Sequence, residues 1–438
     1  MRKIIYFIFF VNSLFAARLI WLGSLQTPYA EPHGVSTDGN VVAGWAGVSE
    51  IHRAWRWIPD SGMIDIGSLA PGRHAEAWGL SPDGHTIVGY GFIDVSRYRG
   101  FYWREGNMHQ LGTFGGDNSW AYGASFDGSV IVGSAETITG FNRAFRWKAD
   151  SGMQSLGTLP GAIRSVARGV SFDGRVVVGW SGFANQIHHA FRWENGQMVD
   201  IHNPAFGQSE AISVSGDGEV VIGAWGPIDW IPTRAFRWTR NTGMYDLGTL
   251  GGEWSEAWGA DFYGRKIVGW AESSQGNWRA FLWTAENGMQ NLNALYGYLL
   301  RPGSILKGAY AISADGRYIV GVGYNSETGR EEAFWLDTEC SEIEEKINLF
   351  SNNNFDIFIK SFGLNNKIIY KIPFKTKVEI NLYDFLGRKI TVLKNKILES
   401  GEYETKLNIN NLPTGIYFCE LKISNNAKIK KFLYVKIK

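Results

Sequence analysis

The stretch "RAFRW" at residues 143–147 is written again at 234–238, and three near-copies lie elsewhere in the chain. The near-copies read "RAWRW" at 53–57, "HAFRW" at 189–193 and "RAFLW" at 279–283. Alternating apolar and polar side chains are typical of a half-buried β-strand. A strand motif that returns along the chain predicts a fold built from one repeated unit, and the spacing of its copies measures that unit.

A second motif, Ser-x-Asp-Gly, returns in step with the first. Its seven versions are "STDG" (36–39), "SPDG" (81–84), "SFDG" (125–128 and 171–174), "SGDG" (215–218), "DFYG" (261–264) and "SADG" (313–316). Both motifs recur at separations of 44 to 52 residues, so they belong to a single unit of about 45 residues. Asp-Gly between two β-rich runs predicts a hairpin, because Gly accepts the positive φ of a tight turn.

Each unit contains four short β-rich runs. β-branched runs such as "VVVGW" (176–180) precede the "RAFRW" strand, and turns such as "ADSGM" (149–153) lead from it into a fourth run. Four antiparallel strands in about 45 residues are typical of one blade of a β-propeller. Seven units therefore predict an all-β fold with a seven-bladed β-propeller over residues 18–336.

The two ends of the repeat region complement each other. The last copy, "EAFWL" (332–336), has no fourth run after it, whereas the chain begins with "LIWLGSL" (19–25), which matches "MIDIGSL" (63–69). We therefore expect the N-terminal strand to complete the last blade, which closes the propeller and removes an open sheet edge.

The recurrence of "RAFRW" in every unit predicts a role in the scaffold, because a functional site usually breaks the symmetry of a repeat. We expect Trp147 and Trp238 to be buried between blades. We expect the Arg residues of this motif to pair with carboxylates at one repeat position, Glu76, Glu210 and Glu256.

Three stretches carry a resemblance to a known repeat family. They are "HAFRW" (189–193), "SFDGRVVVGW" (171–180) and "DLGTLGG" (246–252). The repeat resembles the HAF family of probable extracellular repeats. The resemblance implies an exported protein and implies no activity.

The N-terminus predicts export by itself. Arg2 and Lys3 precede an apolar run at 4–11 that is too short to span a bilayer, so residues 1–17 are typical of a signal peptide. The alternative is a short N-terminal strand. No other stretch approaches the length of a membrane span. Cys340 and Cys419 form a disulfide after export or remain two thiols, and the sequence leaves both open.

Composition separates the last part of the chain from the repeats. Residues 360–438 hold fifteen Lys, one Arg and six acidic residues, whereas all nineteen Trp lie before residue 336. The segment 337–359, acidic and then Asn-rich, is predicted to be a linker. The formal net charge of the whole chain is only +1, which gives no argument for a nucleic-acid partner.

The tail resembles the type A sorting domain of the type IX secretion system. The resemblance rests on "LYDFLGRKI" (382–390), "LPTGIYFCEL" (412–421) and "KKFLYVK" (430–436), and "SNNN" (351–354) stands where a Tyr-Pro-Asn-Pro sequence is usual. It implies a small Ig-like β-sandwich over 360–438 and the type IX translocon as partner. The residues that carry it are Gly387, Arg388, Gly415, Tyr417, Lys430 and Lys431. The alternative is a sandwich with a binding role of its own.

Motifs with a chemical mechanism are missing from the sequence. It contains no G-x-S-x-G, no H-E-x-x-H, no Gly-rich loop that leads into a helix and no Cys pair for zinc. We therefore predict no catalytic residue, no cofactor and no metal ligand. We expect the His residues of "IHH" (187–189), at the junction of a loop and a strand, to be exposed, and a metal site there is the alternative.

Binding is the function that the sequence favours. Connections that vary between units share one face of a propeller, and variable loops on a rigid ring commonly carry function. We expect three Trp of these loops to stack on a glycan or protein ligand: Trp120, Trp230 and Trp254. The aromatic residues that follow the Gly of the second strand are expected to pack between blades: Trp45, Tyr90, Trp180 and Trp270.

Two functions from different classes follow. The first is an exported cell-surface or secreted propeller with a non-enzymatic binding or structural role. The second is a propeller enzyme acting on polysaccharide, a glycoside hydrolase or lyase. A carboxylate cluster with a raised pKa in the central funnel would distinguish the enzyme. The sequence shows no acid cluster confined to one unit, so the binding function leads.

Overall fold

The computed structural model describes residues 17–48, 51–228 and 232–339, and parts of the tail between 356 and 434. The described parts of the tail are 356–360, 367–372, 375–384, 389–406, 412, 415–423 and 426–434. Several predicted features lie outside the described residues: the signal peptide up to residue 16, Trp230, most of the linker (340–355) with Cys340, and Gly387 and Arg388.

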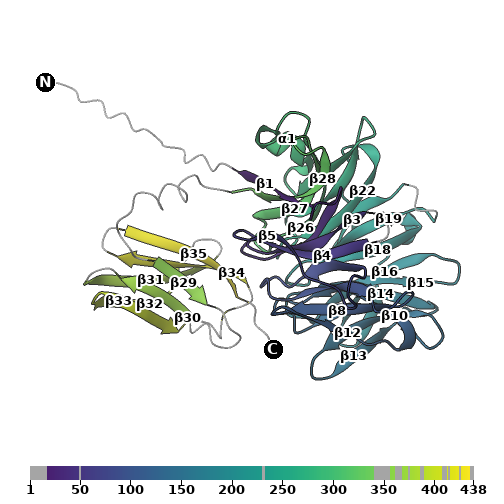
Figure 1. The fold of residues 1–438 in the computed structure, drawn as a ribbon, viewed down its shortest axis with the longest axis horizontal. Helices are drawn as coiled ribbons and strands as arrows, with labels where there is room; N and C mark the ends of the chain where they lie inside the picture. The colour runs from purple at the N-terminus through teal and green to yellow at the C-terminus, as the bar shows by residue number, and fades with distance from the viewer. Residues whose placement is uncertain are drawn as a thin grey trace.

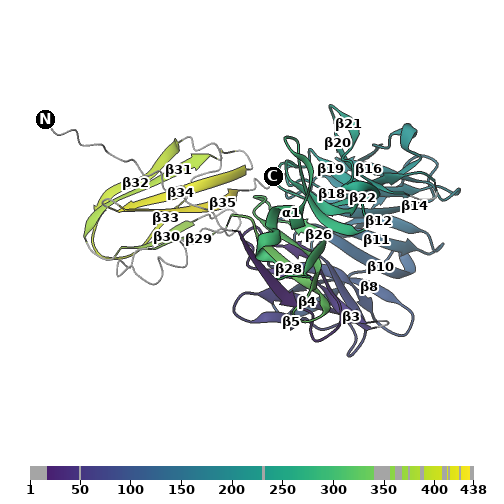
Figure 2. The same ribbon diagram turned by 90° about the horizontal axis from the view of Figure 1, so that it is seen from above.

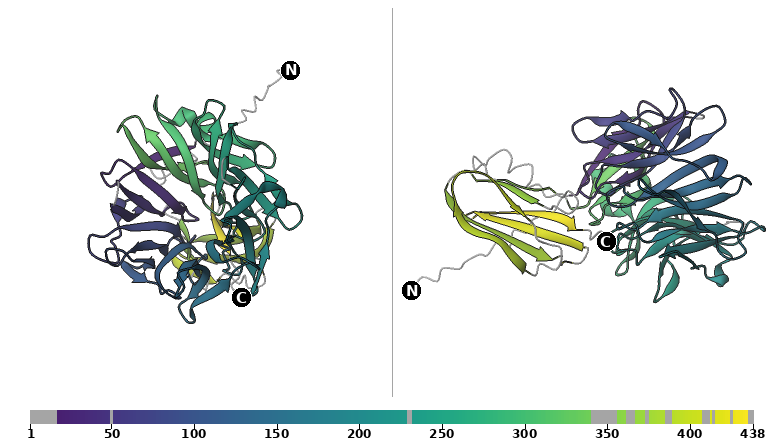
Figure 3. Two further views of the ribbon diagram at one scale, coloured as in Figure 1. Left: turned by 90° about the vertical axis from the view of Figure 1, so that its right-hand side faces the viewer. Right: turned by 90° about the horizontal axis from the view of Figure 1, so that it is seen from below.

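Up to residue 337, the chain forms seven four-stranded antiparallel sheets that follow one another around a common centre (Figure 1, Figure 3). In six of them, the four strands are consecutive in the chain. Their first, innermost strands are β2 (Ala30–Val35), β6 (Ala75–Leu80), β10 (Gly115–Ala124), β14 (Arg164–Val170), β18 (Gln208–Val214) and β22 (Gly251–Ala260). Their second strands are β3 (Val42–Val48), β7 (Ile87–Phe92), β11 (Ile131–Thr137), β15 (Val177–Gly182), β19 (Val221–Gly226) and β23 (Ile267–Ser273).

The "RAFRW" copies form the third strands, as predicted. These are β4 (Ile51–Ile58), β8 (Tyr98–Arg104), β12 (Asn142–Lys148), β16 (His188–Glu194), β20 (Arg234–Thr239) and β24 (Trp278–Thr284). The fourth strands are β5 (Gly62–Asp65), β9 (Asn107–Gln110), β13 (Gly152–Gly157), β17 (Gln197–Asp200), β21 (Gly243–Asp246) and β25 (Gly288–Asn291).

The seventh sheet combines both ends of the repeat region. Its strands are β26 (Ile305–Ile312), β27 (Tyr318–Asn325), β28 (Arg330–Asp337) and β1 (Arg18–Gly23). β1 pairs antiparallel with β28, with Leu19 opposite Leu336, so the N-terminal strand takes the place that the sequence predicted. Each first strand contacts the next one around the centre, and β26 contacts β2.

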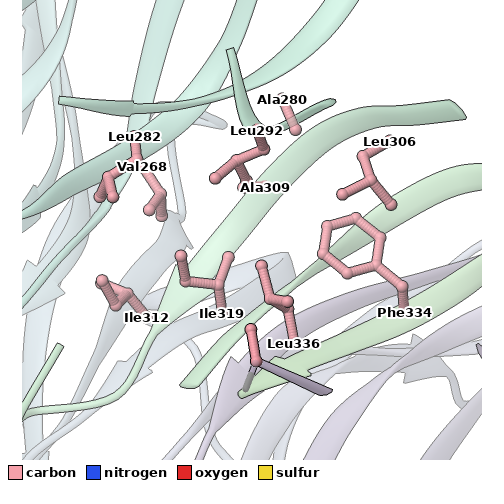
Figure 4. Close-up of a cluster of buried hydrophobic side chains, with 11 residues drawn as sticks. Val268, Ala280, Leu282, Leu292, Leu306, Ala309, Ile312, Ile319, Phe334 and Leu336 are labelled. Carbon is pink, nitrogen blue, oxygen red and sulfur yellow. The ribbon is translucent and has the colours of Figure 1, made fainter. Parts of the chain in front are cut away.

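A hydrophobic cluster between the sixth and seventh sheets shows how neighbouring sheets pack together (Figure 4). Its side chains come from facing strands of both sheets, and burial of apolar area of this kind is the main stabilising contribution to the fold. The cluster includes Val268, Ala280, Leu282, Leu292, Leu306, Ala309, Ile312, Ile319, Phe334 and Leu336.

Helices are short and lie in the connections. They are the 3-10 turns η1 (Pro204–Phe206) and η2 (Gly297–Leu299) and the helix α1 (Leu292–Tyr296). The connection between β25 and β26 therefore contains helical turns, and Leu292 anchors them in the core. Within the described residues, no helix has the length and apolarity that crossing a membrane requires.

The Ser-x-Asp-Gly turns owe their shape to local hydrogen bonds. In one of them, Ser171 Oγ donates to Asp173 Oδ1 at 2.7 Å and accepts from the backbone N–H of Val176 at 3.0 Å. Gly174 follows with φ of 70°, a conformation that favours Gly. In "DFYG", Asp261 replaces the Ser and accepts from the backbone N–H of Arg265 at 2.7 Å.

The Phe of "RAFRW" is the buried anchor of the unit. Phe145 and Phe236 are fully buried, whereas Trp147 and Trp238 are only half-buried. The prediction of buried Trp at these positions was therefore wrong. Each Phe lies opposite a Gly of the second strand.

The Arg residues of the motif do not bind the predicted Glu residues. The first Arg can pair with an Asp of the fourth strand, as Arg234 does with Asp246 at 2.9 Å, whereas the second binds a backbone carbonyl. Arg146 Nε donates to the carbonyl of Gly174 in the next sheet at 3.0 Å, and Arg237 Nε donates likewise to Gly264 at 3.3 Å. Glu76 instead meets His52, the residue before Arg53. Successive side chains of a strand point to opposite faces, so the Arg and its predecessor cannot share a partner.

The tail forms two further sheets, drawn in yellow-green and yellow (Figure 2). One contains β29 (Asp356–Lys360), β30 (Lys367–Ile372) and β33 (Gly401–Lys406). The other contains β32 (Lys389–Leu398), β31 (Thr376–Asp384), β34 (Gly415–Ile423) and β35 (Asn426–Tyr434). One buried cluster draws alternate residues from both sheets, as in a β-sandwich, and includes Tyr370, Leu382 and Cys419. Cys419 is a free thiol whose pKa burial raises to about 12.

Candidate functional site in the central channel

Every innermost strand contains a β-bulge at the same repeat position. In β6, Ala77 lies opposite Gly89 and Gly79 lies opposite Val88, so Trp78 has no partner in the next strand. A bulge of this kind re-aims the side chain of the extra residue. The seven bulged residues are His33, Trp78, Tyr122, Arg168, Ile212, Trp258 and Tyr310.

A Gly in the second strand accompanies each bulge. A Cβ atom at Gly179 would lie 1.9 Å from the carbonyl oxygen of Val166, and the same collision would occur at Gly89 with Glu76. The bulged strand therefore approaches so closely that only Gly fits opposite it. This contact explains why "VVVGW" and its copies keep their Gly.

The bulged side chains meet around the axis of the ring. The His33 ring stacks on Trp78 with centroids 4.3 Å apart, and Tyr310 contacts both His33 at 5.5 Å and Trp258 at 5.2 Å. Tyr122 continues the ring at 6.0 Å from Trp78. Residues far apart in the sequence thus form one aromatic ring, which we call the channel ring.

Arg168 adds the cation of the channel ring. Its guanidinium carbon lies 4.7 Å from the centroid of Tyr122 and 6.0 Å from that of Trp78. These are cation–π distances. Its Nε is buried and has no hydrogen-bond partner within the described part of the chain.

A cavity of about 170 Å³ lies against the channel ring. The seven bulged residues line it on one side, and residues of the Ser-x-Asp-Gly turns, such as Pro82, Phe172 and Ala314, line it on the other. Backbone hydrogen bonds link neighbouring turns, for example from Phe126 N–H to the carbonyl of Phe172 at 2.9 Å. The cavity is lined by aromatic and apolar side chains together with polar groups such as His33 and Arg168.

Several innermost strands carry a carboxylate just before the bulged residue in the sequence. Four innermost strands carry Glu two residues before the bulge: Glu31, Glu76, Glu210 and Glu256. Trp78 Nε1 donates to Glu76 Oε2 at 2.6 Å, and Trp258 Nε1 donates to Glu256 Oε2 at 3.2 Å. The sequence places Glu76, Glu210 and Glu256 at one repeat position but does not predict that they gather beside the channel, because each belongs to a different repeat unit.

Two of these carboxyl groups have opposite pKa shifts. Burial, together with the charge of Glu210, raises the pKa of Glu256 to about 7, although a hydrogen bond from Trp258 and the charge of Arg168 act in the opposite direction. Burial also acts on Glu76, but there hydrogen bonds outweigh it and lower the pKa to about 2. The donors to Glu76 are His74, Tyr90, His52 and Trp78. The Glu76 carboxylate is thus ionised at neutral pH, whereas Glu256 titrates near neutral pH.

Two of the Trp residues predicted to bind a ligand lie in strands and not in the expected loops. Trp120 belongs to β10 and Trp254 to β22, so both are half-buried strand residues and not loop residues. Trp120 lies 6.1 Å from Tyr98, and Trp254 lies 6.3 Å from Trp278, between ring centroids. The extended "GGDNSW" and "GGEWSE" segments pair with the following strand, which turned the predicted loops into strand. Their role in binding stays a prediction.

One group of residues has the composition of a metal site, which the sequence analysis missed. His52, His74 and Glu76 offer ligand atoms that all lie within 4.8 Å of one another. The residues of "IHH" are engaged as well: His188 Nδ1 lies 2.5 Å from Glu210, and His189 Nδ1 lies 2.8 Å from Asp200.

Sorting-motif residues occupy the last two strands. Gly415 begins β34, and Tyr417 of the same strand is buried. Lys430 and Lys431 lie in β35, opposite Cys419 and Phe418.

The channel ring was not identified from the sequence, because the residue type at this repeat position varies between units. The repeat reads Ala-x-Gly at this position in several units, and x changes from Trp to Tyr to Arg. A single variable position between two constant ones was the signal that could have identified it. The bulge that turns x toward the axis depends on backbone pairing and cannot be read from composition.

Comparison with known proteins identifies the tail. Residues 365–436 match the family described as the secretion system C-terminal sorting domain. No curated protein matches the chain.

Solved structures of low sequence identity share part of the arrangement. The β-propeller domain of the Trilobed protease from Pyrococcus furiosus is 11% identical, with 72% of this chain and 97% of that one covered and a TM-score of 0.47. PorZ from Porphyromonas gingivalis is 11% identical, with 94% and 60% covered and a TM-score of 0.43. TolB from Acinetobacter baumannii is 15% identical, with 73% and 66% covered and a TM-score of 0.40.

These scores are too low to carry an argument about activity. The chain is all-β, with many four-stranded sheets in a propeller-like arrangement, followed by a secretion-system sorting domain. Such a tail implies handling by the type IX secretion machinery and a location at the cell surface or in the medium.

Proposed function

We propose that this protein is an exported cell-surface or secreted propeller that binds a ligand without catalysing a reaction. Delivery would proceed through the type IX secretion system by means of the C-terminal domain. The observation that supports binding most directly is the channel ring, because seven bulges aim side chains of five residue types at one cavity. A scaffold position would keep one residue type, whereas this position varies from unit to unit.

The chemistry of the channel ring favours a ligand with a ring or a flat face. Trp78 and Trp258 present aromatic faces beside the polar groups of Glu76 and Glu256. Aromatic faces stack on sugar rings and on peptide side chains, and the adjacent carboxylates accept hydrogen bonds from hydroxyl or amino groups. A glycan or a protein segment would satisfy both.

We infer three finer features of the architecture. The seven sheets form a closed seven-bladed propeller of HAF-type repeats, an inference supported by the pairing of β1 with β28 and the contact of β2 with β26. Residues 1–17 act as a signal peptide, supported by their basic start and apolar run. Trp120 and Trp254 extend the binding surface toward the variable connections.

The test is a screen of the purified full chain against immobilised glycans, followed by titration of any glycan that is retained. Trp78→Ala and Trp258→Ala should each weaken binding about tenfold or more, which corresponds to about 1.4 kcal/mol. Tyr245→Ala is the matched control, because Tyr245 is 60% exposed on the fourth strand β21. Titration curves that are unchanged in both Trp variants would overturn the assignment of the channel ring.

A second candidate is an enzyme that acts on polysaccharide, a glycoside hydrolase or lyase. One observation favours it: Glu256, with a pKa of about 7, lies within electrostatic reach of Glu210 and Arg168. A general acid needs a pKa near the working pH, and glycoside hydrolysis uses two carboxyl groups. Incubation with a polysaccharide panel at pH 6–7 should then release shorter products, and Glu256→Gln should abolish their release. Intact polysaccharide after long incubation would exclude this candidate for the panel used.

A further inference from the structure

Two imidazoles and one carboxylate meet where the first two sheets adjoin. His52 belongs to β4, and His74 and Glu76 lie at the start of β6. Glu76 Oε1 lies 2.5 Å from His52 Nδ1 and 3.1 Å from His74 Nε2. The candidate ligand atoms of the three residues all lie within 4.8 Å of one another.

The carboxylate of this cluster is already oriented by its surroundings. Glu76 Oε2 accepts from Tyr90 Oη at 2.5 Å and from Trp78 Nε1 at 2.6 Å. The other oxygen, Oε1, is thereby directed at the two imidazoles. Hydrogen bonds of this kind hold metal-binding carboxylates in place and are part of the design of metal sites.

The two imidazoles are held by aromatic packing. The His52 ring stacks on Trp45 with centroids 4.3 Å apart, and the His74 ring contacts Phe92 at 5.4 Å. The side chains of His52 and His74 remain 20% and 12% exposed, so solvent reaches the cluster. The donor atoms are therefore both positioned and accessible.

The charge of Glu76 lacks a permanent counterion. Its side chain is 6% exposed, and within the described residues its ion pairs involve only the two His, which carry charge only when protonated. Hydrogen bonds from Tyr90 and Trp78 stabilise the ionised carboxylate, but they supply no full positive charge. A divalent cation would supply that charge.

The repeat provides an internal comparison. His188 and Glu210 reproduce the pair of His52 and Glu76 in another sheet, with 2.5 Å between Nδ1 and Oε1. The position of His74 is taken there by Gln208. Among the described residues, the three-ligand combination occurs at one place, so it breaks the symmetry of the repeat as a site does.

We propose that His52, His74 and Glu76 bind a divalent transition-metal ion, for which Zn²⁺ is the probe. Two nitrogen donors and one oxygen donor suit Zn²⁺ and its first-row neighbours. Bonds of about 2.0–2.2 Å in a tetrahedral site place donor atoms about 3.3 Å apart. The His74–Glu76 distance of 3.1 Å already fits, and the His52–Glu76 distance must lengthen by less than 1 Å. Solvent or a ligand group would complete the coordination.

A metal-free hydrogen-bonded triad is the competing arrangement. In it, both imidazoles donate to Glu76 Oε1, and His74 Nδ1 accepts from the backbone N–H of His52 at 3.3 Å. Metal binding replaces the two ring hydrogen bonds, and each ring proton moves to the other nitrogen of its imidazole. In His74 the proton then lies on Nδ1, so the hydrogen bond from the backbone N–H of His52 is broken as well. The two arrangements differ in whether the protein takes up metal, which titration measures directly.

The experiment uses the full chain without an affinity tag, stripped with a chelator and titrated with ZnCl₂ in a calorimeter. We expect one ion per chain and a higher melting temperature with Zn²⁺, because a ligand that binds only the folded state stabilises it. Glu76→Gln and His74→Gln should each weaken the affinity at least about tenfold. His74→Gln reproduces the residue of the equivalent position, Gln208, so the local fold should tolerate it.

His188→Gln and His189→Gln are the matched controls, because these residues form His–carboxylate pairs elsewhere. They should leave the Zn²⁺ affinity unchanged. Absence of Zn²⁺ uptake by the parent chain would overturn the proposal in favour of the hydrogen-bonded triad. Uptake that survives both Glu76→Gln and His74→Gln, or that is lost in a control, would place the ion elsewhere. The outcome does not depend on the proposed ligand of the channel ring.

Discussion

Trp335 Nε1 donates a hydrogen bond to the carbonyl oxygen of Gly39 at 2.9 Å, across 296 positions of sequence. Trp335 belongs to β28 in the seventh sheet, and Gly39 ends the first Ser-x-Asp-Gly turn. In other sheets, Arg146 and Arg237 make the corresponding contact with the turn of the next sheet. The bond therefore repeats between the last and first sheets a contact that links consecutive sheets elsewhere.

Closure can be tested at this junction. Deleting residues 18–25 removes β1 and exposes the edge of β28, so the melting temperature of the propeller should fall markedly. Trp335→Phe should lower the free energy of unfolding by about 1 kcal/mol in addition to the effect of the smaller buried ring, because the Gly39 carbonyl loses its hydrogen-bond donor. Trp283→Phe in β24 is the matched control. The Trp283 side chain is only 7% exposed, and it makes no hydrogen bond among the described residues. An unchanged melting temperature after the deletion would disprove the role of β1.

The interior of each unit should depend on Phe more than on Trp. Phe236→Ala should reduce the free energy of unfolding by roughly 3–5 kcal/mol, because the side chain is fully buried and leaves a cavity. Trp238→Ala should cost less, since that ring is only half-buried. Denaturant unfolding of both variants measures the difference. A larger loss for Trp238→Ala would show that the outer contacts dominate.

Glu256 should make stability depend on pH. Its pKa is raised from 4.5 to about 7, so the folded protein binds the proton more tightly than the unfolded chain does. The contribution of this group is fully favourable below about pH 4.5 and is lost as the pH rises through 7. The loss amounts to at most about 3 kcal/mol, at about 1.4 kcal/mol for each tenfold change in proton affinity.

The measurement is the free energy of unfolding between pH 5 and pH 8 for the parent chain and for Glu256→Gln. The Gln variant should be relatively more stable at pH 8 and should show a flatter pH dependence in this window. Glu76→Gln serves for contrast, because the pKa of Glu76 is lowered to about 2 and its titration lies below the window. Equal slopes in the parent and Glu256→Gln would show that Glu256 does not titrate there.

Export should require the tail. A chain that lacks residues 360–438 should remain in the periplasm of a host with a working type IX system, whereas the full chain should reach the surface or the medium. The match of residues 365–436 to the sorting-domain family is the reason. Cell fractionation with an antibody against the repeats measures both. Equal surface delivery of the two chains would contradict sorting by this domain.

The sequence determined the repeat unit, its four strands, its turns and the place of the first strand. Each of these depends on patterns within a few residues: alternation in "RAFRW", Asp-Gly in the hairpins, and the match of 19–25 to 63–69. The tail was identified in the same way, from local strand motifs that carry the sorting resemblance. Within a unit, local backbone preferences are enough, because its neighbouring strands are also neighbours in sequence. The place of β1, which pairs with the distant β28, follows from the likeness of its sequence to the fourth strands.

The candidate sites were decided only by the tertiary structure. Trp78 and Arg168 reach one cavity because bulges in separate strands re-aim them, and those bulges depend on close contact with Gly of the next strand. His52 meets Glu76 across two sheets, in a register that no periodicity encodes. Trp120 became part of a strand when its expected loop found a partner. Sequence patterns specify how a unit folds, whereas contacts between units depend on how whole sheets pack, which is a property of the assembled ring.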